Sequence, residues 1–168
     1  MDNTIYLIGQ ILGIVAVILG FISFQMKSQY GIIVVQCATG FVFSAHYFLI
    51  SAPTAVVLNL VTAFICVFYA FRNKRQSKNI VEVVVTVALI VIAGLFAWES
   101  VYSLLLIAGL ALHTISLSLS NPQNTRKLVF FKSPLCFAYN FIVGSVGGVI
   151  FECTILTSAI IGLIKNRK

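Results

Sequence analysis

Two polar side chains inside long apolar stretches are the residues most able to do chemistry in this sequence. Glu152 lies in an apolar stretch near the C-terminus, and Asn59 lies 93 residues before it in a similar stretch. A charge at the centre of a bilayer costs about 2.5–3.5 kcal/mol on insertion scales, so an acid there needs a reason. A carboxylate at that depth attracts a cation or is held protonated by desolvation, and an amide donates and accepts hydrogen bonds. We predict a proton-coupling or cation-binding role for Glu152; the alternative is a neutral acid that only bonds a neighbouring helix.

Further polar residues lie near the ends of other apolar stretches. His46 and Tyr47 precede a short turn, and Tyr139 and Asn140 occupy the equivalent positions 93 residues later. Each pair offers two hydrogen-bonding side chains close to the outer surface, which would suit an outer gate. The alternative is the interfacial belt, where such side chains rest at head-group level. His113 is a further candidate, either for a proton relay or for a bond between helices.

Patterns typical of catalysis are missing from the sequence. It contains no glycine-rich phosphate loop, no His-x-x-x-His pair and no Cys-x-x-Cys pair. The acids inside apolar stretches, Glu82 and Glu152, fall at opposite membrane depths, too far apart to act on one substrate. We therefore expect no enzymatic activity, no bound metal and no cofactor.

The elements that must position these residues are membrane-spanning helices. A bilayer core of about 30 Å needs roughly 20 apolar residues at a rise of 1.5 Å each. Hydrophobic residues make up 60% of the chain, and seven suitable runs are present: Ile5 to Phe24, Gly31 to Ile50, Pro53 to Phe71, Ile80 to Trp98, Val101 to Leu119, Leu128 to Val143, and Val146 to Ile164. The predicted fold class is all-α, a polytopic membrane protein with seven transmembrane helices.

Lysine and arginine residues fall at one side of these runs. They occupy the first, third and fifth connections and the tail: Lys27; Arg72, Lys74, Arg75 and Lys78; Arg126, Lys127 and Lys132; and Lys165, Arg167 and Lys168. By the positive-inside rule these segments face the cytoplasm, which predicts an outer N-terminus and a cytoplasmic C-terminus. The net charge of +7 then serves topology and contacts with anionic lipid, so we expect no nucleic-acid partner.

The sequence also matches itself at a constant offset of 93 residues without a gap. The clearest stretch aligns residues 44–50 with residues 137–143, and basic segments close both units at residues 72–75 and 165–168. Each unit holds three predicted helices. Three crossings invert the chain, so one extra helix restores the direction for the second copy. We predict two parallel triple-helix bundles, residues 1–75 and 100–168, joined by a linker helix within residues 76–99.

This three-plus-one-plus-three plan resembles that of the SWEET sugar transporters and the wider PQ-loop superfamily. Two segments resemble degenerate PQ motifs, Phe24-Gln25 and Asn121-Pro122-Gln123. Another set of segments is similar to the YgjV-type bacterial inner-membrane proteins: Ser44-Ala45-His46-Tyr47-Phe48-Leu49-Ile50, Pro53-Thr54-Ala55 and Val57-Leu58-Asn59. The resemblance to the SWEET fold implies that the third and seventh helices line a central cavity, with Asn59 and Glu152 facing each other across it. The YgjV resemblance implies the bacterial inner membrane.

Two classes of function follow. The first is a secondary transporter that moves a small polar solute by alternating access, with Glu152 linking transport to a proton or cation. Its predicted substrate-binding residues are Asn59, Glu152, His46, Tyr139 and Asn140. The second is a non-transporting scaffold or sensor subunit of the membrane that contacts a partner protein. A homodimer is compatible with transport, although two bundles in one chain suffice for a pathway.

Overall fold

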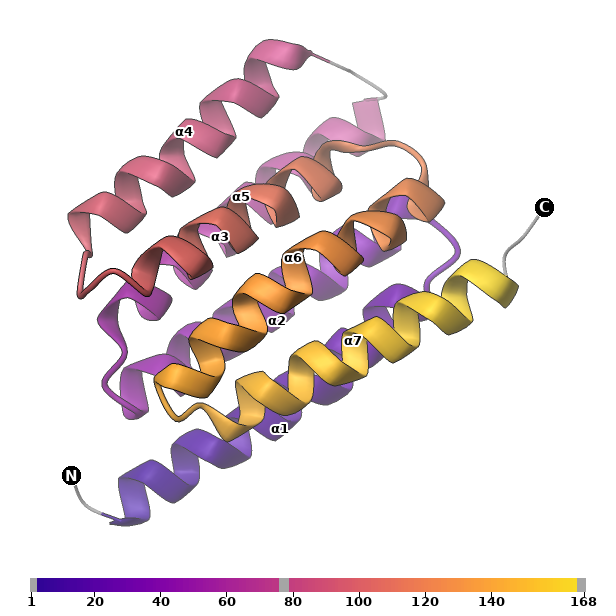
Figure 1. Ribbon diagram of the computed structural model, residues 1–168. Coiled ribbons are helices and arrows are strands. Elements are labelled where there is room, and N and C mark those ends of the chain that lie inside the picture. Colours follow the sequence, from indigo (N-terminus) through magenta and orange to yellow (C-terminus); the bar gives the residue numbers. More distant parts are fainter. Residues whose placement is uncertain (1–2, 76–78, 166–168) are drawn as a thin grey trace.

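The computed structural model describes residues 3–75 and 79–165, and all its regular elements in that part of the chain are helices (Figure 1). Their bounds are α1 Asn3–Gln25, α2 Gln29–Leu49, α3 Pro53–Arg75, α4 Ile80–Phe96, α5 Ser103–Ser118, α6 Pro122–Ile142 and α7 Val146–Lys165. The prediction of an all-α fold with seven helices is confirmed.

Four helices are long and apolar enough to cross a membrane: Thr4–Gln25, Gln29–Leu49, Pro53–Arg72 and Val146–Lys165. The apolar helices α4 and α5 are shorter, at 17 and 16 residues. Helix α6 has 21 residues but carries basic side chains along its first half.

The position of α6 corrects one prediction. The hydropathy pattern predicted a helix from Leu128, with Lys132 assigned to a polar connection, but α6 begins at Pro122 and Lys132 lies ten residues further along. That distance corresponds to about 15 Å of helix. Lys132 is therefore in the middle of α6 and not at its cytoplasmic end. The early start has a local cause, because the Asn121 side chain accepts a hydrogen bond from the Gln123 amide and Pro122 occupies the first turn.

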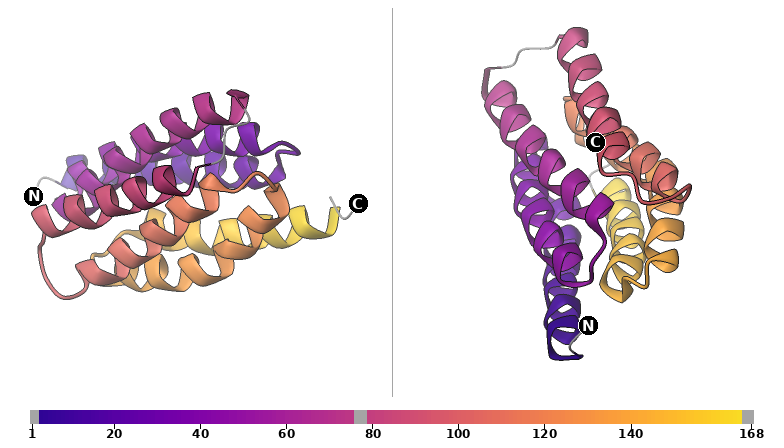
Figure 2. Two further views of the ribbon diagram at one scale, coloured as in Figure 1. Left: turned by 90° about the horizontal axis from the view of Figure 1, so that it is seen from above. Right: turned by 90° about the vertical axis from the view of Figure 1, so that its left-hand side faces the viewer.

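The helices form two layers (Figure 2). In one layer α2 packs between α1 and α3, and in the other α6 packs between α5 and α7. The layers meet along both edges, where α1 contacts α7 and α3 contacts α5. Helix α4 packs against α5 and α3, on the outside of the edge where these two helices meet. Figure 1 shows α5, α6 and α7 in front of α3, α2 and α1.

The 93-residue offset recurs in the backbone. Helices α2 and α6 begin and end 93 residues apart, and so do the C-terminal ends of α1 and α5. The turns after α2 and α6 place Ser51 and Gly144 at positive φ, 60° and 70°. The turn hydrogen bonds also correspond, since Ala52 N donates to Tyr47 O and Ser145 N donates to Asn140 O. The two halves of the chain thus form the same sequence of helices and turns despite low sequence identity.

Helices α1 and α7 approach each other most closely at a pair of glycines. A Cβ atom added to Gly147 would lie 2.7 Å from Gly13 Cα, and one added to Gly13 would lie 3.0 Å from Gly147 Cα. Such distances leave no room for a side chain between the two backbones. The small residues therefore set the spacing of this edge of the two layers.

We predict that Gly147→Leu destabilises the folded protein by about 1–3 kcal/mol, because the new side chain forces α1 and α7 apart. Thermal unfolding in detergent measures the effect. Val146→Leu is the matched control, since it places the same side chain one residue earlier at a position that is exposed. Equal unfolding temperatures for the two variants would contradict the close approach.

Candidate functional site

A cavity of about 30 Å³ lies between the two layers. Side chains from α2, α3, α5, α6 and α7 surround it. Its polar lining residues are Gln36, Thr39, Tyr47, Asn59, Thr62, His113, Lys132, Asn140 and Glu152, and its apolar ones are Phe43, Leu106, Leu110, Cys136 and Phe151, together with Gly40. A space of this size holds about two water molecules. Its walls are thus rich in hydrogen-bonding groups, and they include a lysine and an acid.

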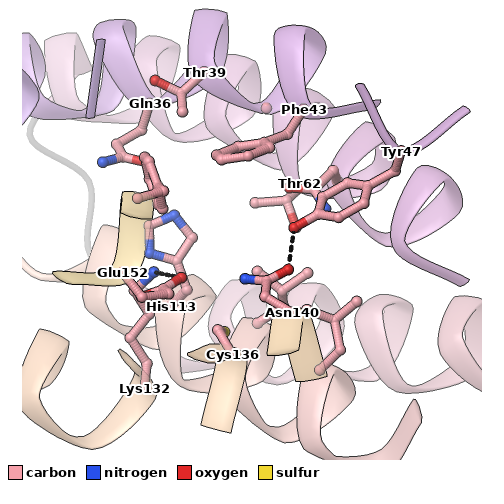
Figure 3. Close-up of a pocket in the computed structure, with 15 residues that line it drawn as sticks. Gln36, Thr39, Phe43, Tyr47, Thr62, His113, Lys132, Cys136, Asn140 and Glu152 are labelled. Carbon is pink, nitrogen blue, oxygen red and sulfur yellow. Dashed lines mark hydrogen bonds and ion pairs between the residues drawn. The ribbon is translucent and has the colours of Figure 1, made fainter. Parts of the chain in front are cut away.

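One end of the cavity carries a buried ion pair (Figure 3). Lys132 Nζ lies 3.2 Å from Glu152 Oε1, and the two side chains are only 5% and 4% exposed. Lys132 Nζ also lies 5.4 Å from the centre of the Phe151 ring. Burying two charges costs several kcal/mol per ion, and their attraction offsets this cost only if further hydrogen bonds satisfy the remaining groups.

Those further hydrogen bonds are incomplete. Glu152 Oε2 and His113 Nδ1 are buried and have no hydrogen-bond partner in the described part of the chain. An ammonium group carries three donors, and Lys132 directs one of them to Glu152. Figure 3 shows His113 beside Glu152 on the same side of the cavity. This end of the cavity therefore offers both an open acceptor and open donors to whatever occupies it.

The other end is closed by a neutral contact. Tyr47 Oη donates a hydrogen bond of 2.5 Å to Asn140 Oδ1, which joins α2 of one layer to α6 of the other. The two residues are 93 apart and so occupy equivalent positions in the repeat. They lie beside the turns that follow α2 and α6. The Tyr47–Asn140 bond thus separates the cavity from that end of the molecule.

Equivalent positions line the cavity throughout. Besides Tyr47 and Asn140, three other pairs of lining residues are 93 residues apart: Thr39 and Lys132, Phe43 and Cys136, and Asn59 and Glu152. On α6 the lining residues are spaced four apart, so they form one face of the helix. The same spacing applies on α2 from Thr39 through Phe43 to Tyr47. The two halves therefore contribute the same positions but different side chains.

The structure brings three of the five predicted substrate-binding residues to the cavity, namely Asn59, Asn140 and Glu152. His46 is fully buried between α1 and α7, where its ring nitrogens lie 2.7 Å from Gly9 O and 2.7 Å from Ser145 Oγ. Tyr139 is directed to the turn before α5, with its hydroxyl 3.5 Å from Glu99 Oε2. Neither of these two residues lines the cavity.

Lys132 is the site residue that the sequence interpretation missed, and His113 and Tyr47 belong to the site more directly than expected. A signal for Lys132 was present. It aligns with Thr39 at the repeat offset, and it lies four and eight residues before Cys136 and Asn140. A residue on the same helical face as Asn140 must point into the same space.

The opposite end of the molecule is closed by crossed contacts between the layers. Gln29 Nε2 of α2 donates to the carbonyls of Ser116 and Leu117 at the end of α5, at 3.5 Å and 3.3 Å. Arg126 of α6 donates to the carbonyls of Phe24 and Met26 at the end of α1, at 3.0 Å and 2.6 Å. Each layer thus caps the free helix-end carbonyls of the other.

Comparison with known proteins places the chain in a family. The sequence model for Imp-YgjV, described as bacterial inner membrane protein, matches residues 7–168. The chain belongs to the Imp-YgjV family. It is therefore a member of a family of bacterial inner membrane proteins, which agrees with its long apolar helices. A search of the curated proteins and a search of the solved structures found no match.

The buried pair in this Imp-YgjV member predicts strong coupling between two substitutions. Lys132→Met or Glu152→Met alone should lower the free energy of unfolding by about 3–5 kcal/mol, because each leaves one charge buried without its partner. The double variant should lose far less free energy of unfolding than the sum of the losses in the two single variants, since it contains neither charge. Unfolding of the three variants in detergent measures the cycle. Additive effects would show that the two side chains do not interact.

Proposed function

We propose that this protein is a secondary transporter that moves a small polar solute across the bacterial inner membrane by alternating access. The observation that carries the proposal is the cavity between the two layers, in which an ion pair with open hydrogen-bonding atoms faces hydroxyl and amide groups. Polar groups at membrane depth are costly and mark solute or ion pathways. Binding sites of transporters built from repeats lie at the interface of the repeats, as this cavity does.

In this proposal all seven helices cross the bilayer. Residues 1–75 and 100–168 form two parallel triple-helix bundles, and α4, within residues 76–99, links them. The matching helix bounds and turns at the 93-residue offset support this assignment, as does the meeting of Tyr47 and Asn140 at equivalent positions. This proposed plan resembles that of the SWEET and PQ-loop transporters. One chain supplies both halves of the cavity, so a second copy is unnecessary for the pathway.

We further propose that the N-terminus is outside and the C-terminus is cytoplasmic. The basic residues Lys27, Arg72, Lys127 and Lys165 lie at the end of the molecule where α1, α3 and α7 finish. Glu99 lies at the other end, in the turn between α4 and α5. Cytoplasmic connections carry the excess of lysine and arginine, which supports this orientation.

The two closed ends then act as gates. The Tyr47–Asn140 bond forms the outer gate, and the Gln29 and Arg126 contacts form the inner gate. The described structure corresponds to an occluded state, since both gates are closed around the cavity. Rocking one layer against the other would open one gate while the other stays closed.

A native thiol in the cavity wall can report on these gates. Cys136 is buried and lines the cavity, so we predict that a membrane-impermeant thiol reagent modifies it slowly when both gates are closed. In a chain whose other three cysteines are changed to alanine, Arg126→Ala should raise the modification rate at least several-fold from the cytoplasmic side only. Lys127→Ala is the control, because Lys127 is an exposed neighbour of Arg126. Equal rates in the two variants would contradict the inner gate.

Glu152 is the proposed coupling residue. The titratable side chains that surround it in the cavity are Lys132 and Cys136 of α6, His113 of α5 and Tyr47 of α2. A proton on Glu152 would remove the charge that neutralises Lys132 and so weaken the pair. Loading a proton would thereby change the charge that the cavity presents to its solute, which links the two binding events.

We predict that uptake into vesicles by the unmodified protein depends on pH, and that Glu152→Gln removes this dependence because the amide cannot bind the proton. Glu82→Gln is the matched control, since Glu82 pairs with Arg72 on the other face of α3, at 3.6 Å, outside the cavity. Uptake that keeps its pH profile in Glu152→Gln would remove the coupling role. Absence of uptake for every solute, with co-purification of a partner protein, would favour a scaffold or sensor subunit instead.

A further inference from the structure

We propose that the solute is a small zwitterion, with an ammonium group and a carboxylate separated by one or two carbon atoms. This inference rests on the proposed transport function and names its substrate class. Four features of the cavity carry it: its charge balance, its open hydrogen-bonding atoms, its apolar walls and its size.

The charge balance excludes ions as the preferred solute. Lys132 and Glu152 are the charged residues among those that line the cavity, and their charges cancel when His113 is counted as neutral. A solute with a net charge would leave water for a closed space that holds no compensating charge, which is costly. A solute that is neutral overall avoids this cost.

The open atoms favour a dipolar solute over an uncharged one. Glu152 Oε2 has no hydrogen-bond partner among the described residues and can accept hydrogen bonds from an ammonium group. Lys132 keeps donors beyond the one that it gives to Glu152 Oε1 at 3.2 Å, and these can reach a carboxylate. A zwitterion beside the ion pair could place its ammonium group next to Glu152 and its carboxylate next to Lys132. A polyol would also form hydrogen bonds to these two charged side chains, but a zwitterion adds the Coulomb attraction between full charges to the same hydrogen bonds.

The apolar walls and the size of the cavity limit the part of the solute that lies between its two charged groups. The large apolar residues that line the cavity are Phe43, Phe151, Leu106 and Leu110. Figure 3 shows Phe43 between the charged end and the Tyr47–Asn140 end. The volume of about 30 Å³, which holds about two water molecules, favours the smallest zwitterions. We therefore expect glycine to fit best, with alanine and β-alanine at the upper limit, and larger amino acids and sugars to be excluded from the occluded state.

The first test compares ligands with the unmodified, full-length protein in detergent. Thermal unfolding is followed with glycine, alanine, glycerol, glucose, methylammonium chloride and sodium acetate, at equal ionic strength. Glycine or alanine should raise the unfolding temperature, whereas methylammonium and acetate supplied together should not, because the two charges must be in one molecule. A larger shift with glycerol or glucose than with any of the zwitterions would overturn the inference.

A second test changes the charge of the cavity. Glu152→Gln leaves the Lys132 charge unbalanced, so acetate should now stabilise the protein more than glycine does. Lys132→Met should reverse the preference toward methylammonium. Glu82→Gln, which alters an acid outside the cavity, should keep the preference for glycine. If both cavity variants kept the preference for glycine, the assignment of Lys132 and Glu152 as the groups that bind the charges of the solute would be overturned.

Because each single substitution destabilises the protein, the charge-swapped variant Lys132→Glu/Glu152→Lys provides a version that keeps both charges. It should retain the glycine response, and loss of that response with retained folding counts against the inference. Uptake of labelled glycine into proteoliposomes separates this inference from the transport proposal. Uptake of glycerol but not of glycine would support transport and overturn the proposal of a zwitterionic solute. Binding of glycine without uptake would support the zwitterionic solute and overturn the proposal of transport.

Discussion

The buried pair of Lys132 and Glu152 is the interaction on which the rest of this structure depends. It explains why the least apolar helix, α6, occupies the middle of its layer, with α5 and α7 on either side and α2 opposite. A lysine facing lipid at that depth would be expelled toward the interface. Paired with an acid at one end of the cavity, the same lysine is retained, and its charge defines the polar centre of the protein.

The pair also shows that the two similar halves of the chain contribute different side chains to the cavity. At equivalent positions the first half carries the neutral residues Thr39 and Asn59, and the second half carries Lys132 and Glu152. The strong interaction therefore lies within one layer, between α6 and α7. Across the cavity the layers are joined by a single described bond between neutral groups, Tyr47 to Asn140. Relative movement of the layers would break this bond, or the Gln29 and Arg126 contacts at the other end, and would leave the ion pair intact.

Much of this arrangement could be predicted from the sequence. Hydropathy gave the number of helices, and the 93-residue offset led to the pairing of Asn59 with Glu152, which share the cavity. Lys132 was assigned to a cytoplasmic connection because the positive-inside rule places cations there. The cap at Asn121 starts α6 six residues before the predicted start at Leu128, and a buried acid pairs with Lys132 in the middle of this helix. His46 and Tyr139 were misplaced for another reason. Each is adjacent in sequence to a cavity residue, and a step of one residue rotates a side chain by about 100°, away from the cavity face.

The crossed contacts of Gln29 and Arg126 have a consequence for biosynthesis. Arg126 supplies partners for the carbonyls of Phe24 and Met26, yet it emerges from the ribosome about a hundred residues after them. The first three helices are therefore synthesised before the side chain that caps the end of α1. The end of α1 gains its cap only after α6 has been synthesised. Folding of the first half of the chain is therefore completed by the second half.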